Sequence, residues 1–252
     1  GERQERRARD QFQQVAEQME QAIASGGGRW LDPDAPDGPI PGTADLVFIP
    51  YVERMNASLA YFKGFALRRE HPLIDRWLTA LEQLDTYRGT QSDMHTHAHD
   101  LPPQMGGCWA DGSEVQQRMA HALDSGAGLD ALERSWAPSA ASVSAQERAL
   151  ERVLRHRSTL LNRSPLGERF DQPLRAALSA LMLEQPVKPA SGSAAALRYL
   201  RDRISVPRDM PLESARSLRQ ALESTAALDG DQQPEPLPFE HRFDQDPRPF
   251  LS

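Results

Sequence analysis

The chain has little cysteine and little lysine. Cys108 is the only cysteine among 252 residues, which excludes a framework of intramolecular disulfides. The absence of such a framework is typical of proteins from a reducing compartment, such as the cytoplasm, so the sequence predicts a location of that kind. Lys63 and Lys188 are the only lysines, and all other basic residues are arginines. No apolar run approaches the roughly 18 residues that suggest a membrane span, so no membrane contact is expected.

The chain also has fewer basic than acidic residues. The 29 basic residues face 36 acidic residues, and the formal net charge is -7. Nucleic acid is therefore not an expected partner, because phosphate binding requires a basic surface. No segment predicts a β-sheet, and no repeat with a period of 20–50 residues is present. These absences leave an all-α class.

Helical periodicity dominates what is there. Residues 3–24 place apolar side chains on one stripe, and the "SGGG" that follows ends the helix. Residues 42–62 contain in their first half the run "LVFIPYV", which is apolar nearly all round and predicts a central buried helix. Pro50 disfavours a strand there, because proline cannot donate to a β-ladder. In "HPLIDRWLTALEQL", Pro72 starts a helix whose apolar face includes Trp77.

The second half of the chain predicts further helices. Ser144 and Glu147 form a capping box, in which each side chain accepts the other residue's backbone N–H. We expect four regions: a helical core at 1–88, a His-rich loop at 89–112, a helical extension packed on the core at 113–228, and an extended proline-rich tail at 229–252.

Residues 1–88 resemble the helical C-terminal domain of the glutathione transferase family. The resemblance rests on "PGTADLVFIPYVERM" and on "HPLIDRWLTALE". The family's central helix opens with a Ser/Thr-x-x-Asp box, and Asp45 matches its acid, whereas Gly42 stands at the Ser/Thr position. We expect Asp45 to be a structural helix N-cap that acts through its carboxylate, not a catalytic acid. The resemblance implies a glutathione-transferase C-terminal-like helical bundle, here with a helical extension and a tail.

The remainder is similar to a longer glutathione-transferase-like group of oxygenic phototrophs, through "THAHDLPPQ" and "YLRDRISVPRDM". That similarity would also allow a plastid location. The family resemblance implies glutathione as co-substrate, bound mainly by a thioredoxin-like domain, and it allows a homodimer. This sequence has no βαβ pattern for such a domain, so no catalytic or substrate-binding residue transfers. The chain would be the half that contacts a hydrophobic small-molecule substrate, and alone it would be inactive. The alternative is a non-catalytic helical interaction module on the same scaffold.

The segment 91–109, "QSDMHTHAHDLPPQMGGCW", is the most polar motif. If it were extended, His95, His97 and His99 would share one face and could bind zinc, copper, nickel or iron. A fourth ligand could come from Asp93, Asp100 or Cys108. The Asp-x-His-x-His opening of metal-dependent hydrolases does not fit, because those histidines end a barrel strand.

We expect instead a structural role for this motif and no metal. Ser92, Thr96 and Asp100 can supply hydrogen-bond partners to the histidines, and Pro102–Pro103 would fix the exit of the loop. Cys108 lacks a neighbour that would lower its pKa, so we expect packing rather than nucleophilic chemistry.

Overall fold

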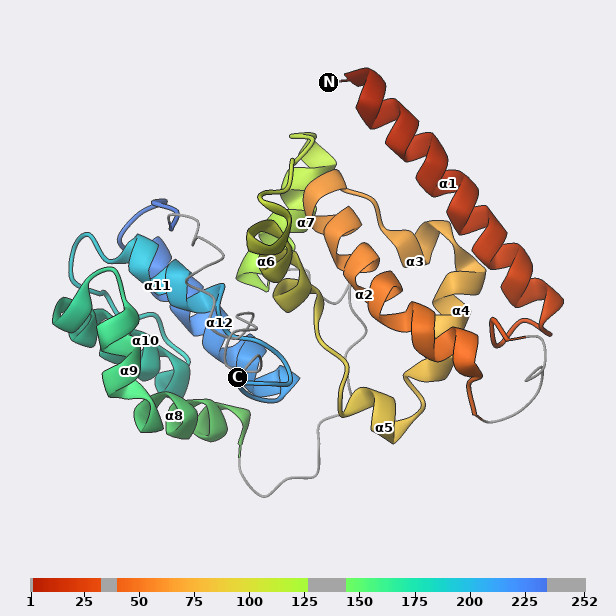
Figure 1. The fold of residues 1–252 in the computed structure, drawn as a ribbon. Helices are drawn as coiled ribbons and strands as arrows, with labels where there is room; N and C mark the ends of the chain where they lie inside the picture. Colours follow the sequence, from red (N-terminus) through yellow and green to blue (C-terminus); the bar gives the residue numbers. More distant parts are fainter. Residues whose placement is uncertain (1, 33–39, 127–143, 235–252) are drawn as a thin grey trace, which may run out of the picture. The chain divides into compact units, whose positions relative to one another are not determined.

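The computed structural model describes residues 2–32, 40–126 and 144–234. Every regular element in these ranges is a helix, which confirms the all-α class (Figure 1). The chain divides into two compact units, which are described separately. Unit 1 comprises 1–60 and 65–91, and unit 2 comprises 61–64 and 92–252. The predicted boundary at 88 lies three residues before Gln91, where unit 1 ends.

The described residues of unit 1 form five helices: α1 (Glu2–Ser25), α2 (Thr43–Lys63), α3 (Leu67–Glu70), α4 (Pro72–Leu81) and α5 (Asp85–Arg88). The last residues of α2, from Tyr61 onward, are assigned to unit 2. Its core contains two fully buried tryptophans, Trp30 and Trp77, together with aliphatic side chains of α1, α2 and α4. The apolar face predicted for "HPLIDRWLTALEQL" enters this core through Ile74, Trp77 and Leu78. Burial of that face explains why α4 forms where the pattern placed it.

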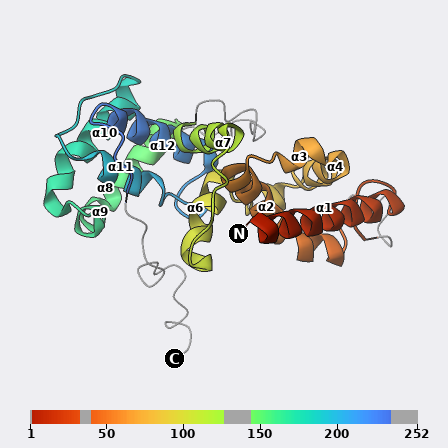
Figure 2. The same cartoon turned by 90° about the horizontal axis from the view of Figure 1, so that it is seen from above.

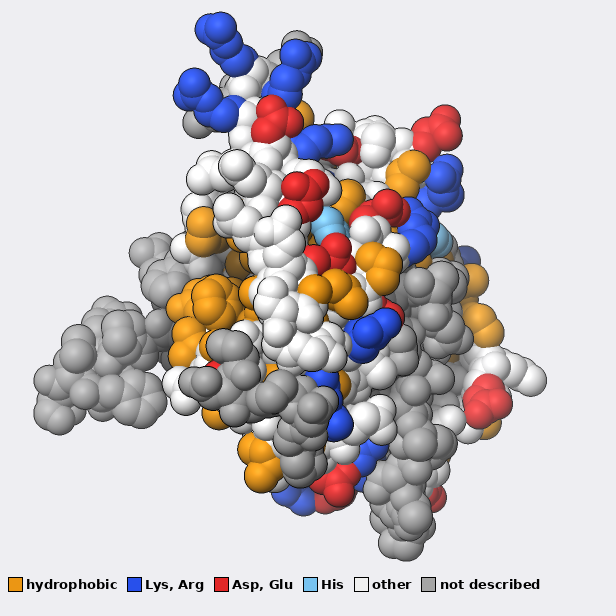
Figure 3. All heavy atoms as spheres, turned by 90° about the vertical axis from the view of Figure 1, so that its right-hand side faces the viewer, with side chains coloured by type: hydrophobic (Ala, Val, Ile, Leu, Met, Phe, Trp, Pro, Cys, Tyr) orange, Lys and Arg blue, Asp and Glu red, His pale blue; other side chains and the backbone are white. Residues whose placement is uncertain are grey.

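The prediction that the apolar run of α2 is buried all round is wrong. Ile49 and Val52 enter the core of unit 1, but Leu46, Val47, Phe48 and Tyr51 are each more than half exposed. Only one side of a helix can face a single neighbouring layer, so an apolar sequence does not ensure burial all round. Figure 3 shows apolar side chains at the surface on the face that carries α1.

Asp45 holds the start of α2, but not from the N-cap position that we expected. The helix begins at Thr43, so Gly42 is the residue before it and Asp45 lies within the first turn. The carboxylate of Asp45 accepts hydrogen bonds from the backbone N–H groups of Gly42 at 2.9 Å and Leu31 at 2.7 Å, and from Trp77 Nε1 at 2.6 Å. Within α2 the carboxylate thus reaches back to the N–H of Gly42, the residue before the helix, as the acidic residue of a capping box does.

A glycine stands at position 42 because a side chain has no room there. A Cβ on Gly42 would lie 2.2 Å from Oδ2 and 2.4 Å from Cβ of Asp32. The Ser or Thr of the resembled motif would therefore overlap Asp32, which has to move if position 42 carries a side chain.

Unit 2 holds the remaining elements: α6 (Met94–Met105), α7 (Glu114–Ser125), α8 (Ala145–Arg155), α9 (Arg157–Arg163), the 3₁₀ turn η2 (Gly167–Phe170), α10 (Asp171–Leu183), α11 (Ala194–Arg201) and α12 (Leu212–Ala227). Helix α12 packs against α7, α8, α10 and α11, and Figures 1 and 2 both show it beside α10 and α11. Leu174, Leu197 and Leu222 are fully buried in this core.

Local signals fix several helix ends in unit 2. The predicted capping box is confirmed: Glu147 N–H donates to Ser144 Oγ at 3.1 Å, and Ser144 N–H donates to Glu147 Oε2 at 3.0 Å. Asp229 receives the N–H groups of Gly192, Ser193 and Ala194 at the start of α11. The predicted tail at 229–252 lies outside the described residues from 235 onward.

The expectation of a His-rich loop at 89–112 is wrong, because α6 covers Met94–Met105 in its middle. Asp93 caps this helix by accepting the N–H of Thr96 at 3.2 Å. Pro102 and Pro103 are accommodated near the C-terminal end, and Gly106 ends the helix with a φ of 72°. The helix continues through both prolines: their missing N–H groups remove the helical bonds to the carbonyls of Ala98 and His99, while the N–H of Gly106 still donates to the carbonyl of Pro102.

None of the described helices is long and apolar enough to span a lipid bilayer.

Candidate metal centre

Four side chains of unit 2 converge at one point, where His95 is buried and the other three are partly exposed. His95 and His99 lie one turn apart on α6, so both face the same side of that helix. Asp124 comes from the last turn of α7, and Asp202 directly follows α11. One nitrogen or oxygen from each of these four residues lies within 4.8 Å of all the others.

The distances within this group are short. His99 Nε2 lies 2.8 Å from Asp124 Oδ1 and 3.6 Å from Asp202 Oδ1. His95 Nε2 also lies 3.6 Å from Asp202 Oδ1. The two imidazole rings are tilted by 39°, with their centroids 4.4 Å apart. Two nitrogens and two carboxylates thus point into one small space.

A buried ion pair positions α6. The guanidinium of Arg219, on α12, pairs with Asp93 and donates to Thr96 Oγ1 at 3.1 Å and to the carbonyl of Ile204 at 2.6 Å. Thr96 Oγ1 in turn accepts the backbone N–H of Val206 at 3.0 Å. This network joins α6, α12 and the segment after α11, and so fixes the face on which His95 and His99 lie.

A second set of contacts orients the carboxylates. The hydroxyl of Tyr61 donates to Asp124 Oδ2 at 3.0 Å. The Tyr61 ring packs edge-on against the His99 ring, with the two ring centroids 5.2 Å apart. Arg201 Nε donates to Asp202 Oδ1 at 2.6 Å, and the same guanidinium pairs with Glu223. Partners of this kind commonly orient metal ligands from the second layer of a site.

His95 is held neutral. Its side chain is 2% exposed, and neither ring nitrogen has a hydrogen-bond partner within the described residues. Burial, followed by the positive charges of Arg219 and His99, lowers the pKa of His95 to about 3. A neutral, buried imidazole without a hydrogen bond carries a lone pair that is available to a metal ion.

His99 behaves in the opposite way. Burial works to lower the pKa of His99, but the nearby carboxylates of Asp202 and Asp124 outweigh it and raise that pKa above its usual value. The same pairing holds the pKa values of Asp124 and Asp202 below their usual range, against the effect of burial. Without a metal, an imidazolium between two carboxylates satisfies the charges of this group.

The structure places only some of the metal ligands considered from the sequence in this group. His95 and His99 join the group, whereas His97, Asp100 and Cys108 are not members of it. The helical period explains this, since alternate residues share a face only in an extended chain. Cys108 lies beyond the end of α6, and burial raises the pKa of its thiol.

Sequence reasoning missed Asp124 and Asp202. Asp202 falls inside "YLRDRISVPRDM", the motif that was read only as a sign of resemblance. The one local signal was the His-x-x-x-His spacing of His95 and His99, which indicates a shared face once the segment is known to be a helix.

No protein-family model, no curated protein and no solved structure matches this chain. The chemistry of the site therefore rests on its own geometry.

Proposed function

We propose that unit 2 binds a divalent transition-metal ion through His95, His99, Asp124 and Asp202, and that the ion ties α6, α7 and the end of α11 together. The observation that carries this proposal is His95, whose buried ring has no hydrogen bond in the described part of the chain yet faces three other ligand groups. Burying an unsatisfied polar group is unfavourable, and a metal–nitrogen bond would offset that cost.

The spacing of the ligand atoms supports a tetrahedral site. Metal–ligand bonds of about 2.0–2.2 Å place ligand atoms roughly 3.3–3.6 Å apart in a tetrahedron. Two of the pairs are already 3.6 Å apart. The 2.8 Å pair of His99 and Asp124 is a hydrogen bond that an entering ion would replace.

The donor set favours zinc, with iron as a competitor, over magnesium or calcium, because two ligands are imidazoles. Four protein ligands close a tetrahedral site, which is the arrangement of structural rather than catalytic zinc. Binding requires His99 to lose the proton that Asp124 and Asp202 stabilise, so the metal and the proton compete for the same nitrogen.

The test is metal analysis of protein purified without a histidine tag, together with calorimetric titration of metal-stripped protein with Zn(II). We expect near-stoichiometric binding that is lost in the double variant His95→Ala/His99→Ala. The control is His97→Ala, which removes an imidazole from the same helix outside the group. Absence of zinc binding, or equal binding by the double variant, contradicts the proposal.

The contacts of Asp45 support a second candidate, the helical substrate-pocket half of a glutathione transferase-like protein. Its carboxylate receives the Gly42 N–H across the same four-residue spacing as the family's capping box. The test is the coding sequence upstream of Gly1. A thioredoxin-like βαβ unit with a cis-proline supports this candidate, and an upstream sequence without one contradicts it.

A further inference from the structure

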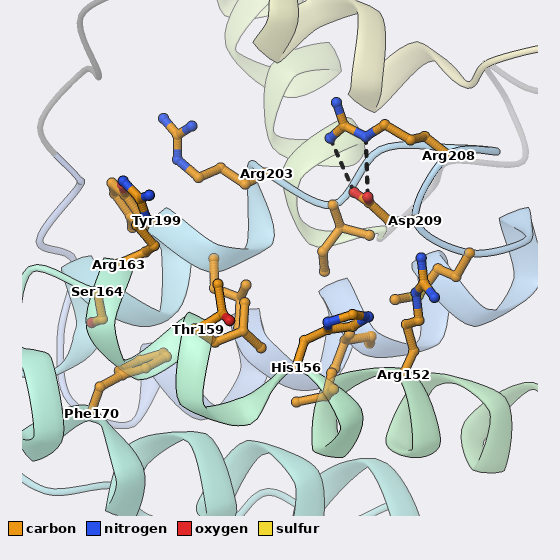
Figure 4. A pocket seen from close by; sticks show the side chains of 16 residues that line it. Arg152, His156, Thr159, Arg163, Ser164, Phe170, Tyr199, Arg203, Arg208 and Asp209 are labelled. Carbon is orange, nitrogen blue, oxygen red and sulfur yellow. Dashed lines mark hydrogen bonds and ion pairs between the residues drawn. The ribbon is translucent and has the colours of Figure 1, made fainter. Parts of the chain in front are cut away.

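Unit 2 contains a cavity whose lining residues do not include any of the candidate metal ligands. Its volume is about 450 Å³, within the range of small-molecule sites, and Figure 4 shows the side chains around it. The lining comes from α8, α9, η2, α11, the segment 203–210 and α12.

The inner wall of the cavity is apolar. It is formed by side chains that also belong to the core of the unit: Val153, Phe170, Ile204, Met210 and Leu218. Each of these is at most 7% exposed, so the wall is fixed by core packing. Such a wall accepts a hydrocarbon or an aromatic body and excludes water.

The rest of the lining is strongly basic. Four arginines contribute to it, Arg152, Arg163, Arg203 and Arg208, against one acidic residue, Asp209. Asp209 pairs with Arg208 at 3.1 Å, as Figure 4 shows, so the lining carries four guanidiniums and one carboxylate. This excess is notable in a chain whose net charge is -7.

The basic groups surround the cavity from two sides. In Figure 4, Arg152 and His156 rise from the helices below the cavity, while Arg203 and Arg208 come from the opposite wall. The guanidinium of Arg203 stacks over the ring of Tyr199, 4.5 Å from its centroid, which restrains its position. Guanidinium groups arranged in this way suit the planar oxygens of a carboxylate or the oxygens of a phosphate.

We propose that this cavity binds a small amphipathic anion, with an oxyanion headgroup held by the arginines and a hydrophobic body against the core wall. The proposal does not depend on the metal centre, because the two sites share no residue. A carboxylate and a phosphate monoester offer the same recognition chemistry, so the experiment has an arm for each.

The experiment is calorimetric titration of the full chain with decanoate and with decyl phosphate. Decan-1-ol is the neutral control, and inorganic phosphate is the headgroup without a body. We expect one or both amphipathic anions to bind, and the tighter one identifies the headgroup. Decanol and inorganic phosphate should each bind at least about tenfold more weakly, since charged hydrogen bonds and apolar burial are both needed. The anion affinity should fall with added salt.

The matched variants are Arg152→Gln/Arg203→Gln, which removes two cations of the lining, and Arg155→Gln, which removes a cation of the same helix outside it. Arg155 pairs with Glu151 on the surface. We expect about a tenfold or larger loss of anion affinity for the double variant and none for Arg155→Gln. Circular dichroism checks the fold, and Arg152→Lys/Arg203→Lys, which keeps the charge, should retain part of the affinity. No binding of either anion, equal binding of decanol, or equal loss in Arg155→Gln overturns the proposal.

Discussion

The carboxylate of Asp45 accepts the indole N–H of Trp77 at 2.6 Å, and both side chains are completely buried. The two residues are 32 positions apart, so this bond joins the start of α2 to the middle of α4. With the N–H groups of Leu31 and Gly42, it makes Asp45 the acceptor for three donors from three parts of unit 1.

The first prediction concerns Asp45→Ala. Capping alone would predict a loss of about 0.5–2 kcal/mol. We expect a loss of at least about 3 kcal/mol in the free energy of unfolding, because three donors lose their acceptor and each unsatisfied buried group costs about 1–3 kcal/mol. Urea denaturation measures it. Asp45→Asn, which keeps one acceptor oxygen, should lose less. A loss within the capping range would show that the Trp77 and Leu31 contacts contribute little.

The second prediction concerns the glycine of the same helix start. Serine is a better N-cap than glycine on an otherwise free helix. Gly42→Ser should nevertheless destabilise the protein, by about 1–3 kcal/mol, because its Cβ would overlap Asp32. Adding Asp32→Gly, which removes the overlapping side-chain atoms including Cβ, should restore much of the loss, and a double-mutant cycle in urea gives the coupling energy. Gly42→Ser with unchanged or increased stability would refute the steric account.

The third prediction follows from the neutral state of buried His95. The pKa of His95 is lowered to about 3 in the folded protein, against about 6.5 in the unfolded chain. Between these values the unfolded state binds more protons, so the stability of the metal-free protein should fall as the pH is lowered from about 6.5 toward 3. The midpoint of urea denaturation across this pH range measures the effect. His95→Gln should show a shallower dependence, and an identical slope in the variant would contradict the assignment.

The fourth prediction concerns metal and heat. An ion that binds only the folded state raises the melting temperature. Zn(II) should therefore stabilise metal-stripped wild-type protein at pH 7, and EDTA should reverse the shift. The gain should shrink at lower pH, because the pKa of His99 is raised and its proton competes with the ion. Asp124→Asn should reduce the shift, whereas Asp100→Asn, outside the group, should retain it. Equal shifts in both variants would place any bound zinc elsewhere.

The fifth prediction concerns glutathione chemistry. The 252-residue chain should not accelerate the reaction of glutathione with an aromatic electrophile above the uncatalysed rate, because its sequence contains no βαβ pattern for a thioredoxin-like domain. A spectrophotometric assay with and without the protein measures this rate. Clear turnover by the purified chain would contradict the prediction.

The sequence by itself determined the elements whose signals are local. The capping box of Ser144 and Glu147 and the apolar face around Trp77 lie where the pattern placed them, because a cap or a helical stripe needs residues only three or four positions apart. The local sequence signals of α6 favoured a loop at some positions and a helix at others. Its two prolines and alternating histidines favoured a loop, but the segment is a helix that Asp93 caps, so His95 pairs with His99 and not with His97.

Tertiary structure alone decided both sites. Asp124 and Asp202 lie 25 and 103 positions after His99, and no spacing rule connects them. They meet the histidines because α12 packs against both α7 and α11 and anchors Asp93, at the start of α6, through Arg219. The basic cavity likewise joins Arg152 of α8 to Arg203 after α11. Sequence periodicity states which face of a helix is apolar, but which polar side chains meet depends on how whole helices pack, and that is set by many contacts at once.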